Sequence, residues 1–404
     1  MRLALLSPLP PDPSALADHA AHYKRALNGV GIDVLTPLVG QRPLDSLAAA
    51  RAWVAERDWR RVDVVHAELG PGRSSEFWVL CALAGLAQRP ALSVTVHEPD
   101  RFIWQPLQWP WRTLFCARAL PRPLRQLAAW LGAPQTRWSE RRLARSLEGV
   151  VVHSEAGAAR LIRRLKVSPD RVSVLPLGVN PALLQPLPPA DPVRVLCVSG
   201  PGQAVRPLED LLAALRRLHD EDPEAAAGLR LTLVGSTAAG LNCPARTDPL
   251  RQLPTTVRQR GLQDAVDWVL DPDVLDVPHL IGSHHVVLVP QASTPDPFND
   301  GTHGVLGHHQ AAVNAAIAGG RALIVCGQGE LAEAVTSGNG VGYPPGAIEA
   351  LAGHLRALVR DPDLLVAWTI QAQALRQVRQ WTQVAPCHLG HFQRVMARVR
   401  GMPT

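Results

Sequence analysis

The sequence predicts an α/β protein with two domains, the second of which is a doubly wound parallel sheet. Two observations lead to this prediction. Between residues 193 and 343, apolar strand-like runs, glycine turns and amphipathic helices alternate in the order of a nucleotide-binding α/β domain. The chain also has 404 residues, whereas a single hydrophobic core rarely grows past about 250 to 300 residues.

The strands expected in the second half are apolar runs that each end in a small residue or a turn. They cover residues 193–200, 229–236, 266–272, 284–291 and 321–329. The first, VRVLCVSG, is a run of β-branched and aliphatic residues, which is typical of a parallel strand buried on both faces. Ligands of such sheets bind at the carboxyl ends of the strands.

A helix is expected directly after the first of these strands. Pro207 suits a first helical position, and Glu209 and Asp210 favour the positive N-terminal end of a helix. Leucines then recur at helical spacing, namely Leu208, Leu211, Leu212, Leu215 and Leu218. The start of this helix is therefore expected at the carboxyl edge of the sheet, where backbone N–H groups can bind an anion.

A proline-rich stretch separates the two halves. Residues 180–192 contain five prolines in 13 residues and no apolar periodicity, which indicates a stiff linker. We place the domain boundary near residue 188.

The composition indicates a globular protein of a reducing compartment. Hydrophobic residues make up 47% of the chain. Six cysteines are scattered without CxxC or metal-like spacing, which favours buried, reduced thiols: Cys81, Cys116, Cys197, Cys243, Cys326 and Cys387. The N-terminus shows no cleavable signal pattern, and no uncharged apolar stretch reaches the roughly 18 residues that a membrane span needs. We expect a cytoplasmic protein.

Motifs along both halves resemble the family 4 glycosyltransferases of the GT-B fold, which are retaining enzymes that use nucleotide sugars. Residues 3–18 resemble the first strand and acceptor loop of that family, and VTVHEPD (94–100) its strand ending in histidine. GVVVHSEAGAARL (149–161) and VSVLPLGVNP (172–181) resemble its VxxSxxxxxxL and VIPNGVD segments. Further on, residues 327–343 are similar to GGxPEVVxDGxxGxL, and residues 380–396 resemble the family's last helix.

The resemblance implies two Rossmann-like doubly wound domains that face each other across a cleft. Residues 1–188 would form the acceptor-side domain and residues 189–378 the nucleotide-sugar domain. Residues 379–404 would form a helix that crosses back to the first domain.

On the donor side, the resemblance implies a phosphate site at Gly200 and Arg206, which stand where the family has GRLxxxKG. A retaining transferase must neutralise the departing diphosphate, and a basic side chain beside a helix N-terminus can do so. The alternative for Arg206 is an exposed arginine at a helix start. Gly235 and Ser236 would let the nucleotide approach the backbone, or simply form a turn. Pro201 replaces the arginine of the family's GR pair.

On the acceptor side, His97 closes a buried strand, and in the family the corresponding histidine contacts the transferred sugar; a structural histidine is the alternative. Ser14, Ala15 and Asp18 follow the first strand, in the loop that faces the acceptor by resemblance. Ala15 occupies the place of a glycine there.

The largest departure from the family is at the ribose and sugar of the donor. Gly307 and Ala315 occupy the two glutamate positions of the family's E-x7-E motif. Either residues such as His308 and Asn314 bind the donor in another way, or the site has decayed. Glu333 remains at the family's PE position. Further residues of this polar segment are Asp296, Asp300, His303, His309 and Gln310. The histidines lack a carboxylate or cysteine partner at a fixed spacing, so we expect no metal, and we expect no cofactor besides the donor substrate.

Charge is concentrated between Arg101 and Arg145. This tract holds nine arginines, one acid (Glu140) and five tryptophans, in a chain of net charge +6. Arginine and tryptophan together suit an anionic membrane surface, and the alternative is a solvated basic face. No recognition helix, zinc finger or RNP-like motif accompanies the charge, so we expect no nucleic-acid partner.

We interpret the chain as a cytoplasmic transferase, peripheral at the inner face of the membrane. It would move a hexose from a nucleotide-diphosphate sugar, with retention, to a glycan or lipid-linked acceptor in polysaccharide or glycolipid biosynthesis. The missing glutamates and Pro201 leave open a catalytically degenerate GT-B protein that acts as a binding or scaffold partner. A third interpretation is a nucleotide-sugar epimerase, which would turn over without an acceptor.

Overall fold

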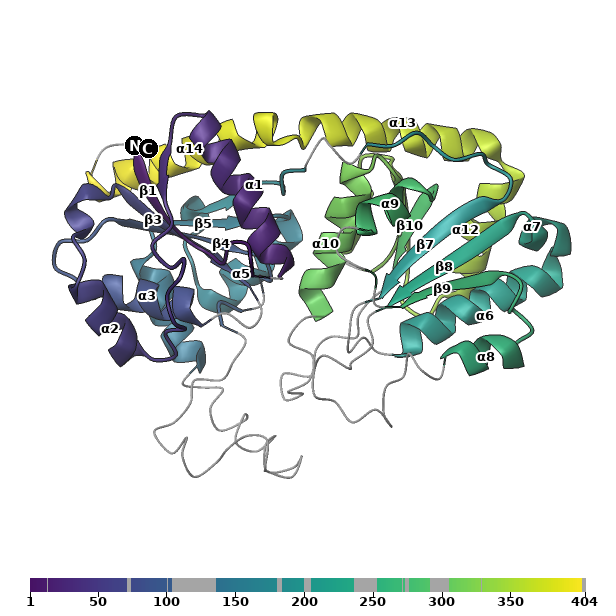
Figure 1. The fold of residues 1–404 in the computed structure, drawn as a ribbon, viewed down its shortest axis with the longest axis horizontal. Coiled ribbons are helices and arrows are strands. Elements are labelled where there is room, and N and C mark those ends of the chain that lie inside the picture. Colours follow the sequence, from purple (N-terminus) through teal and green to yellow (C-terminus); the bar gives the residue numbers. More distant parts are fainter. Residues whose placement is uncertain are drawn as a thin grey trace, which may run out of the picture. The chain divides into compact units, whose positions relative to one another are not determined.

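The chain forms two compact units in the computed structural model, which describes residues 1–12, 14–70, 74–99, 101–103, 136–179, 184–199, 205–235, 253–270, 272, 276–290, 305–327 and 329–401. Unit 1 comprises Met1–Gly178 and Trp381–Thr404, and unit 2 lies between them in the sequence, from Val179 to Gln380. Figure 1 shows a sheet with helices packed on it in each unit. The prediction of two doubly wound α/β domains is confirmed.

The sheet of unit 1 has six parallel strands in the order β2-β1-β3-β4-β5-β6. They are β1 (Arg2–Leu6), β2 (Asp33–Leu35), β3 (Val64–Leu69), β4 (Ala91–Val96), β5 (Gly149–Val152) and β6 (Val172–Val174). The helices are α1 (Ala15–Gly29), α2 (Leu47–Ala55), α3 (Ser75–Leu83), α5 (Glu155–Leu165) and α14 (Trp381–Val399), with helical residues 136–146 and 3₁₀ turns at Trp59–Arg61 and Pro169–Arg171.

Both faces of this sheet are covered, because side chains of a strand alternate between the faces. Leu3 and Leu5 of β1 belong to the apolar cluster that contains Tyr23 of α1 and Phe392 of α14. Leu6 belongs to a second cluster, which contains side chains of α2 and α3. In β3, Val64 lies on the α1/α14 face, so His66 and Glu68 lie on that face too.

A glycine allows α14 to pack closely on the sheet. A Cβ atom at Gly149, the first residue of β5, would lie 2.4 Å from Val395 Cγ2 and 2.7 Å from His391 Cε1. Any larger residue would have to push α14 away from the strand. The C-terminal helix is therefore part of the structure of unit 1, where it contacts α1, β3, β4 and β5.

Unit 2 has a second six-stranded parallel sheet, in the order β12-β11-β10-β7-β8-β9. Its strands are β7 (Val193–Ser199), β8 (Leu229–Gly235), β9 (Val266–Leu270), β10 (Val286–Val289), β11 (Ala322–Cys326) and β12 (Gly340–Tyr343). Its helices are α6 (Val205–Glu221), α7 (Pro223–Ala227), α8 (Leu253–Gln259), α9 (Val277–Gly282), α10 (Val305–Ala318), α11 (Glu330–Glu333), α12 (Ile348–Arg360) and α13 (Pro362–Val378).

The helix expected after the first strand of this unit is present as α6. It begins at Val205, so that Pro207 is its third residue and not its first. This position is still in the first turn of the helix, where backbone N–H groups have no acceptor within the helix. Proline, which has no N–H, therefore costs no helical hydrogen bond there. The five leucines at helical spacing are all buried, and they are Leu208, Leu211, Leu212, Leu215 and Leu218.

Arg321 ties the proline-rich stretch to unit 2. The units divide between Gly178 and Val179, so this stretch lies after the division. The fully buried Arg321 donates from Nη2 to the carbonyls of Gln185 and Pro186, both at 2.9 Å, and of Gly282 at 2.7 Å. The proline-rich stretch, which its composition predicts to be stiff, is therefore also held to unit 2 by hydrogen bonds.

Each sheet has one point where the strand order reverses. This point lies between β1 and β3 in unit 1 and between β7 and β10 in unit 2. In open α/β sheets, ligands bind outside the carboxyl ends of the strands at such points. Among the described residues, no helix is long and apolar enough to span a membrane.

Candidate functional site

The reversal point of unit 1 brings together a cluster of histidines around one carboxylate. Glu68 lies at the end of β3, His97 directly follows β4 and His153 directly follows β5, while His19 lies in the second turn of α1. The ring centroids of His19 and His97 are 5.3 Å apart, and those of His97 and His153 are 5.1 Å apart. We call these four residues the histidine cluster.

Glu68 is the centre of this cluster and is fully buried. Its Oε2 accepts a hydrogen bond of 2.6 Å from His97 Nε2, and its Oε1 accepts one of 3.0 Å from His66 Nε2. His19 Nε2 lies 3.8 Å from Oε2. Burial would raise the pKa of Glu68, but the hydrogen bonds from His66 and His97 outweigh it and hold the pKa well below its usual value. Glu68 is therefore ionised at neutral pH.

Burial keeps four histidines of this region neutral, namely His19, His153, His388 and His391. It lowers the pKa of His19 to about 4 and that of His388 to about 3, and it lowers the pKa of His153 and His391 well below the usual value. The Nδ1 of His153 donates to the carbonyl of Leu175 at 2.9 Å. This bond fixes the tautomer and leaves Nε2 of His153 as an acceptor.

The network extends from Glu68 across the sheet to α14. His66 Nε2 also lies 2.9 Å from Thr95 Oγ1, and its Nδ1 lies 3.1 Å from Ser93 Oγ. Ser93 Oγ is 2.9 Å from His391 Nε2, and His391 Nδ1 is 2.9 Å from Ser173 Oγ. Hydrogen bonds between side chains thus connect the last helix with the carboxylate at the carboxyl edge.

Aromatic side chains of α1 and α14 support His19. Its ring stacks on Tyr23 at 5.9 Å and lies 5.4 Å from the ring of Trp381. The hydroxyl of Tyr23 is 2.8 Å from His388 Nδ1. Gly178 is needed beside Trp381, since a Cβ there would lie 2.3 Å from the indole ring.

Of the predicted residues in unit 1, His97 lies within the cluster, and its side chain is 11% exposed. Ser14 is the N-cap of α1, where its Oγ accepts from the N–H of Ala17 at 3.3 Å. Ala15 is the first residue of that helix, and the exposed Asp18 lies in its first turn. These three residues lie within the five positions before His19, on the same edge of the sheet.

Glu68, His66, His19 and His153 were missed in the sequence analysis. Two polar residues two positions apart, as in VVHAEL, are unusual in a strand that is buried on both faces. This pattern was a usable signal, because a buried acid needs partners.

The predicted donor-side residues of unit 2 follow adjacent strands. Arg206 is the second residue of α6, which follows β7, and His308 and Asn314 lie in α10, which follows β10. The reversal point between β7 and β10 therefore brings the starts of two helices to one edge. Gly235 ends β8 and Glu333 ends α11. Gly200 and Ser236 lie outside the described residues, as do the side chains of Arg206 and His308.

Ala315, which occupies the second glutamate position of the family's E-x7-E motif, lies within α10. It packs against the apolar cluster beneath that helix. A nearby polar contact joins α10 to α11, since Gln310 Nε2 donates to Glu330 Oε2 at 2.7 Å. The two glutamates of the family motif are absent, but polar side chains such as Gln310 are present in α10.

Three side chains of the cluster are of the kind that binds metals. The ligand atoms of His19, Glu68 and His97 all lie within 4.8 Å of one another. Two ligands of a tetrahedral zinc ion would be about 3.4 Å apart, given Zn–N and Zn–O distances of about 2.0 to 2.1 Å. The 2.6 Å between His97 and Glu68 is instead a hydrogen-bond distance, so these atoms are arranged as a donor and an acceptor. The expectation of no metal remains a prediction.

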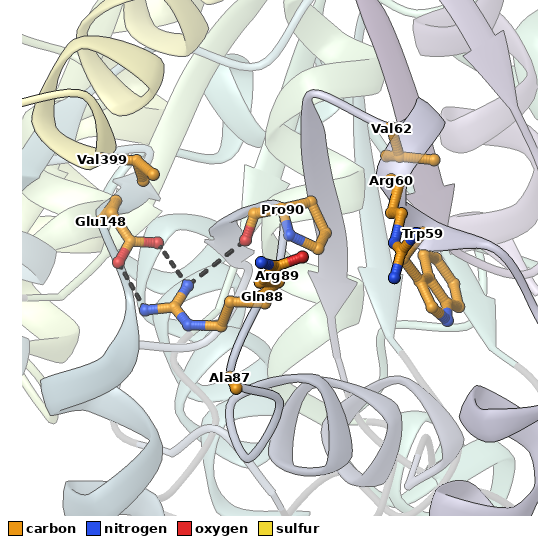
Figure 2. Close-up of a pocket in the computed structure, with 9 residues that line it drawn as sticks. All are labelled: Trp59, Arg60, Val62, Ala87, Gln88, Arg89, Pro90, Glu148 and Val399. Carbon is orange, nitrogen blue, oxygen red and sulfur yellow. Dashed lines mark hydrogen bonds and ion pairs between the residues drawn. The ribbon is translucent and has the colours of Figure 1, made fainter.

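A pocket of about 730 Å³ lies at the opposite edge of the unit 1 sheet, near the amino ends of the strands. Figure 2 shows its lining, with Arg89 paired to Glu148 at 2.7 Å and donating to the carbonyl of Pro90. Arg89 also donates to the carbonyl of Ser146. Because the carboxyl edge is where ligands of such sheets bind, we place the functional site at the histidine cluster and not in this pocket.

Only part of the basic tract can be described. Residues 104–135 lie outside the described residues. Glu140 is fully buried and pairs with Arg164 at 2.6 Å. Trp138 is 60% exposed, and the guanidinium of Arg142 lies 5.5 Å from its ring centroid. The one acid of the tract is therefore internal, while an arginine and a tryptophan share the surface.

Comparisons with known proteins agree with this architecture. Residues 4–183 match the family model of Glycosyltransferase Family 4. This part of the chain, which forms most of unit 1, is therefore similar to a family 4 glycosyltransferase domain. None of the curated proteins compared with the chain matches by sequence.

Solved structures share the two-unit fold of this chain over nearly its whole length. Sucrose-phosphate synthase from Thermosynechococcus elongatus has a TM-score of 0.66 at 19% identity, over 98% of this chain and all of its own. HepE of Anabaena in complex with UDP-glucose has a TM-score of 0.59 at 15% identity, over 100% of both chains. An E. coli trehalose-6-phosphate structure bound with UDP-2-fluoro glucose has a TM-score of 0.62 at 14% identity, over 97% of this chain and 99% of its own.

Proposed function

We propose that this glycosyltransferase moves a hexose from a nucleotide-diphosphate sugar, with retention of configuration, to a glycan or lipid-linked acceptor. The observation that supports this most is the reversal point of unit 2, where α6 and α10 begin at the carboxyl ends of β7 and β10. Helix N-termini at one edge attract a diphosphate. The UDP-sugar complexes among the similar structures support the same class of donor.

In this proposal, Arg206 and backbone N–H groups at the start of α6 stabilise the diphosphate as it leaves. Charge develops on the leaving oxygen in the transition state, and fixed donors aimed at that oxygen lower the barrier. The transfer takes place on the side of the donor sugar that the leaving group occupied. Retention follows from this front-face displacement.

His97 orients the sugar from unit 1. Its ring is partly exposed and held by Glu68 at 2.6 Å. A ring with a fixed orientation can hydrogen-bond a hydroxyl group of the sugar without losing much conformational freedom. Ser14, Ala15 and Asp18 would lie on the acceptor side of the same edge.

The Arg206→Ala variant tests the phosphate site. We expect kcat/KM to fall by about 10²-fold or more, the loss typical when one donor to a developing anion is removed. Release of UDP or GDP from a panel of nucleotide hexoses, with membrane extract as acceptor, measures turnover, and NMR of the anomeric proton of the product measures retention. Arg217→Ala is the matched control, because Arg217 is on the same helix but pairs with Glu221. Unchanged turnover in Arg206→Ala would remove this assignment.

We further propose that the segment 101–145 brings the transferase to an anionic membrane surface at the inner face of the membrane. This placement would bring a lipid-linked acceptor near the enzyme. The described part of the segment supports this proposal with the exposed ring of Trp138 next to Arg142, since tryptophan and arginine suit the headgroup region.

An Arg137→Ser/Arg142→Ser double variant should bind vesicles that contain anionic lipid about tenfold or more weakly, since each basic residue near the surface contributes about 1 kcal/mol. Sedimentation with vesicles that contain phosphatidylserine, an anionic lipid of the cytoplasmic leaflet, measures this. Arg60→Ser/Arg61→Ser is the control, on another exposed part of unit 1. Equal losses in both variants, or binding to neutral vesicles of equal strength, would count against the proposal.

A further inference from the structure

We propose that Glu68 is a positioning residue: it fixes the tautomer and orientation of His97, so that Nε2–H points inward to the carboxylate and Nδ1 is left to meet the ligand. The effect on turnover rests on the proposed function, whereas the tautomer does not depend on it. The proposal extends the site from a single histidine to a hydrogen-bonded chain that reaches the C-terminal helix.

The geometry at Glu68 leaves one arrangement for the proton of His97. An ionised carboxylate can only accept hydrogen bonds. Because His97 Nε2 lies 2.6 Å from Oε2, this nitrogen carries the proton that lies between them. In the part of the chain that the structure describes, Glu68 is the hydrogen-bond partner of the His97 ring, and the side chain of His97 is 11% exposed. Nδ1 is thus the nitrogen available to a bound sugar.

Glu68 is itself held by a chain of donors that all point toward it. One assignment of protons satisfies the four contacts of this chain, and the hydroxyl of Thr95 lies beside the same donor, 2.9 Å from His66 Nε2. Ser173 donates to His391 Nδ1, His391 Nε2 donates to Ser93, Ser93 donates to His66 Nδ1, and His66 Nε2 donates to Glu68 Oε1. Within this chain, Ser93 and the rings of His391 and His66 each donate once and accept once, and Ser173 accepts from Arg394 Nη2 at 3.4 Å. Aligned hydrogen bonds of this kind strengthen one another in a buried environment.

The chain explains why an acid can lie in a strand with no exposed surface. A buried carboxylate is costly unless it is paired and hydrogen-bonded. Both oxygens of Glu68 have donors, Oε2 from His97 and Oε1 from His66. Of these two rings His97 alone is exposed in part, since His66 is fully buried. The carboxylate therefore acts on a ligand through His97.

Glu68→Gln tests the proposal, because glutamine keeps the shape but can turn an N–H toward His97. We expect His97 Nε2 to become the acceptor and Nδ1 to take the proton. Long-range ¹H–¹⁵N NMR of the ligand-free protein measures this tautomer directly. We also expect kcat to fall by about 10²-fold, the size of the loss caused by a small misplacement of a catalytic group, with the donor KM within about threefold of the wild type.

Glu140→Gln is the matched control, since Glu140 is also a fully buried acid of unit 1 but pairs with Arg164. It should change stability and leave the His97 tautomer and kcat as they are. Glu68→Asp retains the acceptor and should keep the wild-type tautomer and recover part of the activity; it takes the place of Glu68→Gln if that variant does not fold.

The proposal is overturned if His97 in the wild type carries its proton on Nδ1, or if Glu68→Gln keeps both tautomer and kcat. It is also overturned if folded Glu68→Asp has lost the wild-type tautomer. A wild type with the expected tautomer but no transferase activity would overturn the proposed function and leave the positioning role standing.

Discussion

Replacing His97 with alanine is expected to lower turnover by about 10²- to 10³-fold while the affinity for the nucleoside diphosphate stays the same. Loss of this size is typical when a group that acts mainly in the transition state is removed. His97 belongs to unit 1, whereas the diphosphate is proposed to bind at the start of α6 in unit 2. Product formation measures turnover, and titration calorimetry with the nucleoside diphosphate measures affinity.

His219→Ala serves as the control for this variant, because His219 is an exposed histidine near the end of α6. It should leave both quantities unchanged. If His97→Ala weakened nucleotide binding and left kcat at the wild-type value, His97 would have a role in ground-state binding, and its proposed part in orienting the sugar would be wrong.

Acid is expected to unfold unit 1 before unit 2. The pKa of His19 is about 4 and that of His388 about 3 in the folded chain, against about 6.5 when unfolded. Between these values the unfolded chain binds more protons, so the free energy of unfolding decreases as the pH falls from about 6.5 toward 4. His153 and His391 act in the same direction.

The size of this effect follows from the same values. Each pKa unit between the folded and unfolded chain corresponds to about 1.4 kcal/mol. His19 contributes less than this, because its side chain is 15% exposed and solvent screens it. Together the buried histidines could remove several kcal/mol, which is a large part of the roughly 5 to 15 kcal/mol that stabilise a typical domain. Glu68 keeps its contribution until the pH falls through its own, lower pKa.

Hydrogen exchange measured by mass spectrometry at pH values from 7 to 4 distinguishes the two units, because peptides report on individual strands. Peptides of β3, β4 and α14 should lose protection at a higher pH than peptides of β7 and β8. Among the described residues, fewer histidines of unit 2 than of unit 1 have a pKa that burial lowers. Those of unit 2 include His284 and His285. Loss of protection in unit 2 first would contradict this account.

Five of the six strands of the unit 2 sheet, β7 to β11, and the course of α6 could be predicted because their signals are local. A run such as VRVLCVSG, or leucines at helical spacing, shows its structure within a few residues of sequence. His97 could also be found from the sequence, since it directly follows a buried strand and matches a family motif. The start of α6 was placed two residues too late, which is within the usual uncertainty of helix ends.

The hydrogen bonds that connect the histidine cluster and its neighbours to α14 could not be predicted, because these contacts are distant in sequence. Ser93 meets His391 across 298 positions, and Tyr23 meets His388 across 365. Nothing near His391 in the sequence indicates that it faces a buried strand of unit 1. The same applies to Arg321, whose carbonyl partner Gln185 is 136 positions away.

Titration calorimetry of the purified protein with UDP, GDP and the corresponding UDP- and GDP-hexoses tests the central claim most directly. The account predicts that at least one nucleoside diphosphate binds, with one site per chain, and that Arg206→Ala weakens this binding while Arg217→Ala does not. No binding to any nucleotide would contradict the account, and it would favour a GT-B protein that serves as a binding or scaffold partner.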